Sequence, residues 1–179
     1  RYLAAAEHPT LSLLMAGEAE PRGWQSGKAR SFEPYDVKAA AIALLVEAGA
    51  PVANLQLTQG AGEAFHPGRS ATLRLGKAEL ARFGELHPAL AKALDLPAGT
   101  QAADLYLDAL PAARDKGRAR PAFTPPALQS VTRDFAFVVP ESLAAGDLVR
   151  AVRGADKALI ADVRVFDRYQ PAEGDLSLA

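Results

Sequence analysis

An alanine-rich run in the first third of the chain, with its larger apolar residues on one side, predicts a helix. Residues 37–48 are rich in alanine, and Asp36 stands immediately before them. The larger apolar side chains recur on one side of the run: Ile42, Leu45 and Val46. A glycine and a proline follow within three residues. An N-capping residue, an apolar stripe and a Gly/Pro stop together predict an amphipathic helix over 37–48, with Asp36 as its N-cap.

Shorter apolar segments predict an antiparallel sheet around this helix. They cover residues 52–58, 71–75, 80–86 and 103–110, and Gly76 with Lys77 would turn the second into the third. Residues 9–17 read as one further strand, which we expect to be buried because its apolar side chains are nearly continuous. A short helix is predicted from Pro88 to Leu94, since proline is well placed at the first helical position.

Residues 111–126 change the character of the sequence and predict a domain boundary. They contain four prolines and a basic cluster that consists of Arg114, Lys116, Arg118 and Arg120. Beyond them we expect a strand over 131–139, a helix over 145–153 that ends at Gly154, and a second strand over 159–169. A strand, a helix and a strand in so short a stretch are typical of half an α+β sandwich.

Composition narrows the class of protein. The chain has 179 residues, 49% of them hydrophobic, and a net charge of −1, which is ordinary for a soluble globular protein and excludes a globally basic nucleic-acid coat. Any RNA contact must therefore be local. No apolar run approaches the roughly 18 residues of a membrane span, and the first residues lack a signal-peptide pattern. The absence of cysteine fits a cytoplasmic protein and excludes disulfides and thiolate chemistry.

The usual signatures of a catalytic or metal site are missing from the sequence. Each of the three histidines (His8, His66 and His87) precedes a proline, and none belongs to a metal-ligand motif. The glycines at 60 and 62 are not followed by the helix start that a phosphate loop needs. Asp104 and Asp108 could share one strand face, but a solvated face explains them as well. We predict no catalytic residue and no metal ligand.

Four motifs occur in order along the chain. Residues 65–71, 83–88, 131–139 and 165–169 read FHPGRSA, FGELHP, VTRDFAFVV and VFDRY. An aromatic-rich turn with Trp24 and residues 32–38 precedes them. The series resembles the C-terminal part of the beta subunit of bacterial phenylalanyl-tRNA synthetase, and the resemblance spans nearly the whole chain.

The resemblance implies an α+β fold in two modules. Residues 1–118 would be the C-terminal part of a catalytic-like, inactive class II synthetase module, an antiparallel sheet with helices. Residues 119–179 would be the N-terminal part of a ferredoxin-fold anticodon-binding domain of order βαββαβ. The residues themselves also indicate inactivity. A GxGxxR motif that starts at Gly60 would need an arginine at the position of Phe65, and the helix that begins at Pro88 offers no arginine to hold ATP phosphates.

The resemblance also implies a function. The chain would be a non-catalytic structural and tRNA-binding portion of a ligase that attaches phenylalanine to tRNA(Phe) at the expense of ATP. Its partners would be the alpha subunit, in an alpha2-beta2 heterotetramer, and the tRNA. ATP and magnesium would belong to the parent complex, and the location would be the cytoplasm. The alternative is a protein–protein interaction scaffold that binds no RNA.

The resemblance further implies an anticodon site. The matching positions are Ala136, Asp167, Tyr169 and Ser177, and they would receive a guanine. Their chemistry is suitable, because a carboxylate accepts hydrogen bonds from guanine, a tyrosine ring stacks on a base and a small alanine leaves room. The alternative is that Asp167 caps a strand end and Tyr169 packs at an edge.

Two further expectations concern the surroundings of this site. Phe135 and Phe137 should pack under the helix, against Leu148, Val149 and Val152. The four basic residues at 114, 116, 118 and 120 alternate, so an extended chain would direct them to one side, toward tRNA phosphates. A merely solvated linker is the other interpretation.

Overall fold

The computed structural model describes residues 7–112, 125 and 128–169. The chain divides into two compact units, residues 1–119 and residues 120–179. Within the described residues no helix combines the length and the apolar character that a membrane crossing requires.

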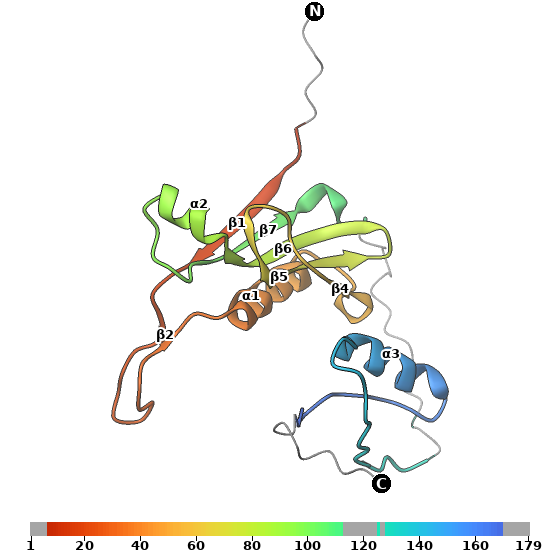
Figure 1. Cartoon of the computed structure of the whole chain (residues 1–179). Coiled ribbons are helices and arrows are strands. Elements are labelled where there is room, and N and C mark those ends of the chain that lie inside the picture. The colour runs from red at the N-terminus through yellow and green to blue at the C-terminus, as the bar shows by residue number, and fades with distance from the viewer. Residues whose placement is uncertain (1–6, 113–124, 126–127, 170–179) are drawn as a thin grey trace, which may run out of the picture. The chain divides into compact units, whose positions relative to one another are not determined.

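A five-stranded antiparallel sheet forms the centre of the first unit, in the order β1-β7-β6-β5-β4 (Figure 1). The strands are β1 (Thr10–Met15), β4 (Gln56–Gln59), β5 (Phe65–Leu75), β6 (Ala78–Leu86) and β7 (Gln101–Tyr106). Gly76 and Lys77 turn β5 into β6, as predicted. The antiparallel pairing and the α+β class expected from the sequence are confirmed.

Several strands depart from the sequence-based expectation in position or burial. β5 starts at Phe65, six residues before the predicted start at residue 71. β1 pairs only with β7 and is an edge strand, so the burial predicted for 9–17 is wrong and Leu14 is 60% exposed. β4 starts late because residues 52–54 form the 3₁₀ turn η1 (Val52–Asn54). β7 ends early because η2 (Leu107–Ala109) follows it, with the Leu107 N–H bonded to the carbonyl of Pro9.

Helix α1 (Pro34–Glu47) begins three residues before the predicted start. Its N-cap is Glu33, and Asp36 lies at the third helical position, where the two residues form a capping box. Pro34 is compatible with this earlier start because the first helical N–H needs no partner. The prediction that Asp36 is the N-cap is therefore wrong by three residues, although Asp36 still secures this end of the helix.

One face of α1 packs on the sheet (Figure 1). The fully buried helix residues are Val37, Ala41 and Leu45, spaced four apart. They meet apolar residues of the three central strands: Ala71, Leu73, Ala81, Phe83, Ala103 and Leu105. Val46 lies outside this face and is 49% exposed, which corrects the predicted stripe.

The opposite face of the sheet carries a polar row that crosses all five strands. Strand pairing aligns its members in the order Ser12, Asp104, Arg82, Thr72 and Thr58. Members of the row have polar partners: Ser12 donates to Asp104 (2.6 Å), Arg82 pairs with Glu79, and the Thr72 hydroxyl donates to the carbonyl of Gly60 (2.7 Å). The Arg82 guanidinium also lies 5.8 Å from the centre of the Tyr106 ring.

Helix α2 (Pro88–Ala93) closes one end of the sheet. His87 is its N-cap and accepts a hydrogen bond from the Ala89 N–H, so the predicted helix start at Pro88 is confirmed. A second apolar cluster joins α2 to the sheet and to the loop before β5. It consists of Ala61, Phe65, Leu86, Ala91 and Ala102.

The second unit has one regular element among its described residues, the helix α3 (Ala145–Ala155). It continues through Gly154, where the sequence predicted a stop. The predicted strands over 131–139 and 159–169 are not formed, and this part of the prediction is wrong. In a split βαβ unit the two strands that flank the helix are separated by another strand, so they have no ladder to form with each other.

The start of α1 provides a pH-dependent test. Asp36 accepts two hydrogen bonds from Arg30 (2.8 and 3.1 Å) and one from the Glu33 N–H (2.8 Å), and these hold the pKa of Asp36 below its ordinary value. A depressed pKa stabilises the fold at pH above that of the unfolded carboxyl, about 4, and this contribution is lost as the pH falls through the lower folded pKa. We therefore expect Asp36→Asn to lower the melting temperature at pH 7 and to reduce the further loss toward pH 3.

The matched control for this experiment is Glu63→Gln. Glu63 is exposed and has no hydrogen bond or ion pair within the described ranges. Its substitution should leave the melting curve unchanged at both pH values. If Asp36→Asn and Glu63→Gln give the same pH profile, the Arg30–Asp36 pair contributes nothing to stability.

Candidate nucleic-acid interface

Three of the four predicted anticodon residues lie in the described part of the second unit, and all three are exposed. Asp167 and Tyr169 belong to one segment and Ala136 to another. Tyr169 is 78% exposed, and within residues 128–169 the Asp167 carboxylate has no hydrogen bond or ion pair. Ser177 lies outside the described residues. The carboxylate and the ring are thus both free to meet a ligand, although in the described segments neither side chain is bonded to Ala136.

Phe135 and Phe137 do not pack under α3 as predicted. They are 71% and 52% exposed, and their ring centres lie 6.4 Å apart with the planes inclined by 30°. The rings are on the same side of their segment, as the alternation indicated, and they contact each other. Their exposure follows from the missing sheet, because without strand pairing the segment has no face to lay against the helix.

Helix α3 presents the apolar side that the sequence predicted. Leu148, Val149 and Val152 are its half-buried residues. Ile160 and Val163 are half-buried in the segment after the helix. The packed side of this unit is therefore built around α3, and the segments that carry the candidate anticodon residues lie largely in solvent.

Some arginines of the second unit are engaged by acids, which limits the charge available to a polyanion. Arg150 pairs with Asp147 (3.0 Å), and Arg153 with Asp162 (2.9 Å). The cations with no acidic partner among the described residues are Arg133, Lys157 and Arg164. The predicted basic cluster (Arg114, Lys116, Arg118 and Arg120) falls outside those residues, so its orientation toward phosphate stays a prediction.

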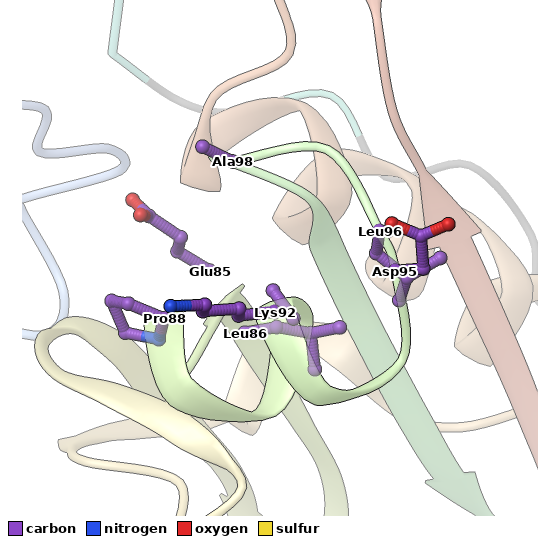
Figure 2. Close-up of a pocket in the computed structure, with 9 residues that line it drawn as sticks. Glu85, Leu86, Pro88, Lys92, Asp95, Leu96 and Ala98 are labelled. Carbon is purple, nitrogen blue, oxygen red and sulfur yellow. The ribbon is translucent and has the colours of Figure 1, made fainter.

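The first unit contains a cavity of about 250 Å³ beside α2 (Figure 2). Its lining combines apolar groups with a few charged ones: Glu85, Leu86, Pro88, Ala91, Lys92, Asp95, Leu96, Ala98 and Gly99. Figure 2 shows the carboxylates of Glu85 and Asp95 at opposite ends of this lining, so they do not form a pair. The cavity does not bring together the two acids that glycosidase-type chemistry needs.

Glu85 is nevertheless held firmly. It is 8% exposed, and Arg69 donates a hydrogen bond of 2.8 Å to its carboxylate. The same contact raises the pKa of Arg69 above its ordinary value. A buried carboxylate that is already neutralised by arginine serves the structure, because a reactive acid or base needs an accessible lone pair or proton.

Asp104 and Asp108, which the sequence could place on one strand face, have different hydrogen-bond partners. Asp104 accepts from Ser12, whereas Asp108 accepts from His8, and the His8 contact lowers the pKa of Asp108. Asp108 also lies in η2, beyond the end of β7, so the two do not share a strand face. Across the described residues no three His, Cys, Asp or Glu side chains are placed to hold a metal ion.

Comparison with family models decides the relationship. The model of the phenylalanyl tRNA synthetase beta chain CLM domain matches residues 3–107. The chain belongs to the phenylalanyl-tRNA synthetase beta chain family. A second model, the ferredoxin-fold anticodon binding domain, matches residues 126–179. The resemblance that rested on the four motifs is confirmed.

Similar beta subunits of phenylalanine–tRNA ligase come from several bacteria. That of Novosphingobium aromaticivorans is 55% identical over all of this chain, and that of Zymomonas mobilis is 48% identical over 94% of it. The chain covers 24% and 22% of the length of these two proteins. It therefore spans about a quarter of the beta subunits that it matches.

Proposed function

We propose that this chain is a non-catalytic, tRNA-binding portion of a phenylalanyl-tRNA synthetase beta subunit. The observation that carries the proposal is the match of residues 126–179 to an anticodon-binding domain, in the same segment that leaves Asp167 and Tyr169 exposed. A scaffold that binds no RNA is the alternative, and a match to an anticodon-binding domain does not support it.

We assign the two modules different tasks. Residues 1–118 form an inactive synthetase-like core that supports the assembly, and residues 119–179 contact the anticodon. The first assignment is supported by Glu85, which Arg69 neutralises, and by the separate partners of Asp104 and Asp108. Each of these three acids already has a partner within the chain, and Asp104 and Asp108 do not meet in one site.

The rest of the reaction belongs to the parent complex. The alpha subunit is the partner that binds ATP, magnesium and phenylalanine, and two copies of each subunit form the heterotetramer. The complex attaches phenylalanine to tRNA(Phe) in the cytoplasm. This chain contributes affinity and anticodon specificity, and it needs no cofactor for that task.

The anticodon site uses two kinds of contact. The Asp167 carboxylate accepts hydrogen bonds from the N1 and N2 donors of a guanine, and the Tyr169 ring offers a stacking surface. Ala136 leaves space for the base, and the Ser177 hydroxyl donates or accepts. The four cations of the linker, at 114, 116, 118 and 120, contact phosphates and make binding dependent on salt.

Replacing Asp167 with asparagine in the intact synthetase tests this site. The amide turns one of two acceptors into a donor that opposes the guanine donors. We expect discrimination between tRNA(Phe) and a tRNA altered at that guanine to fall about tenfold, which is the effect of one hydrogen bond to a charged group. Aminoacylation rates for both tRNAs, measured at equal ionic strength, give the ratio.

Asp134→Asn is the matched control. Asp134 is an exposed acid in the same unit with no ion pair in the part of the chain that the structure describes, so its substitution removes the same charge. It should leave the ratio of the two rates unchanged. Equal losses for both tRNAs with Asp167→Asn would contradict the assignment, because they would indicate a general electrostatic effect.

A further inference from the structure

A two-stranded hairpin stands apart from the five-stranded sheet of the first unit. It consists of β2 (Glu18–Glu20), β3 (Arg30–Ser31) and the connection between them (Figure 1). We call residues 21–29 the hairpin tip. Figure 1 shows the hairpin extending away from the sheet and from α1. Its side chains are therefore not shared with the apolar core of this unit.

The hairpin tip is held by its own hydrogen bonds. Gly23 and Gly27 exchange two backbone hydrogen bonds of 2.9 and 3.4 Å, and the Ser26 hydroxyl donates to the carbonyl of Pro21 (3.0 Å). Gly27 has φ +76°, which a side chain would strain, and a Cβ on Gly23 would come within 2.9 Å of the Ser26 hydroxyl. The hairpin tip is therefore a well-defined turn, which fixes the position of the side chains that it carries.

What the hairpin tip presents is Trp24. It is the single tryptophan of the chain, and it is 92% exposed. Tryptophan is one of the more deeply buried residue types on average. A solvent-exposed indole ring on a well-defined turn therefore indicates a binding surface. Trp24 also borders an open hollow of about 870 Å³, together with Arg22, Gly23, Gly27, Lys28 and Ala29.

The charge of the hairpin tip defines the chemistry of that partner. Arg22 and Lys28 flank the ring and have no acidic partner among the described residues. Arg30, at the base, differs, because Asp36 already neutralises it. The tip therefore offers one large apolar group between two uncompensated cations, and its complement is an apolar pocket with carboxylates at its rim.

We propose that the hairpin tip is a docking anchor that inserts the Trp24 indole into an apolar, acid-rimmed pocket of the partner subunit of the ligase. This rests on the proposed function, in which the chain belongs to a two-subunit enzyme. Tryptophan and arginine are among the residue types that most often dominate the binding energy of a protein interface. In such interfaces the ring is fully desolvated in a pocket of the partner, and the cation lies beside it. The carboxylates of the pocket pair with Arg22 and Lys28.

RNA fits this surface less well than protein. Single-stranded nucleic acid binds along a positively charged groove in which several aromatic rings stack on successive bases. The hairpin tip has a single ring, and the strand that leads to it carries Glu18 and Glu20, which repel phosphates. A protein pocket needs only one ring and tolerates these acids at the edge of the contact.

The test uses the full-length beta subunit and its partner subunit. Trp24→Ala should weaken their association at least tenfold, and Trp24→Phe should restore part of it. Reversing the two charges (Arg22→Glu with Lys28→Glu) should also weaken association, most strongly at low salt. The control is Leu94→Ala, since Leu94 is an exposed apolar residue (59%) outside the hairpin and should leave association unchanged. Each affinity is measured by sedimentation or calorimetry, with tRNA binding measured on the assembled enzyme.

One result would overturn the proposal, and two further measurements would then show what the hairpin tip does instead. Unchanged association for Trp24→Ala excludes docking on the partner subunit. Loss of tRNA affinity with intact association assigns the tip to RNA, and a lower melting temperature of the isolated beta subunit with intact association assigns it to packing within that polypeptide. The proposed function fails in a different way, namely when the assembled wild-type enzyme does not bind tRNA(Phe) through residues 119–179.

Discussion

Gly84→Ala is expected to prevent the five-stranded sheet from forming. Gly84 lies in the central strand β6, opposite Ser70 of β5, with φ +141°. A Cβ at this position would lie 2.5 Å from the Cα of Ser70 and still closer to the carbonyl oxygen of Arg69. Both obstacles are backbone atoms in a buried part of the sheet, so neither can move aside without breaking the β5–β6 ladder. We expect a loss of more than about 4 kcal/mol, or failure to fold.

Gly76→Ala separates the steric clash from the backbone strain. Gly76 also has a positive φ (+61°), but a Cβ added to it would meet no other atom within 4 Å. Its substitution should cost only about 1–2 kcal/mol, the penalty of a left-handed conformation. Urea unfolding of both variants gives the two free energies, with soluble yield as the readout if Gly84→Ala does not fold. Equal costs would show that the close approach of β5 and β6 at Gly84 is not rigid.

Leu45→Ala should produce the second largest loss. Leu45 is fully buried between α1 and the sheet, and truncation of a buried leucine costs about 2–5 kcal/mol, through lost burial and a residual cavity. The neighbouring residue provides the control, since Val46 is 49% exposed and Val46→Ala should change the unfolding free energy by less than about 1 kcal/mol.

Urea or thermal unfolding of these two variants compares adjacent positions of one helix. The pair also decides which face of α1 meets the sheet, because the sequence pattern placed both side chains on the packed side. A larger loss for Val46→Ala than for Leu45→Ala would mean that α1 is rotated about its axis and turns Val46 toward the sheet.

The elements that local chemistry defines were predictable from the sequence. The Pro88 helix has its start signal in two adjacent residues, and the turn at Gly76 and Lys77 needs only its own glycine. The existence of α1 followed from its composition, but its start did not. Glu33 competes with Asp36 as N-cap, and the choice depends on Arg30, which reaches Asp36 from β3.

Features that depend on distant partners were less predictable. β1 has the composition of a buried strand but lies at an edge of the sheet. The order of strands in a sheet depends on which strands pair, and the sequence of one strand does not reveal its partners. The strands expected on either side of α3 fail for a related reason, since a strand requires a neighbour to pair with. For the candidate site, the sequence supplied the residue types at 136, 167 and 169, whereas the exposure of Phe135 and Phe137 depends on tertiary packing.

The polar row across the first sheet also protects the chain from folding into a wrong alignment. Side chains of a strand point alternately to opposite faces, so a slip by one residue would carry a member of the row under α1. In β6 such a slip would bury the Arg82 guanidinium where Ala81 or Phe83 now packs, and would expose an apolar side chain in its place. An unpaired charge in the core is costly enough to reject the misaligned sheet. The alternation within β6 therefore helps to set the register of the sheet, in addition to the turns that connect its strands.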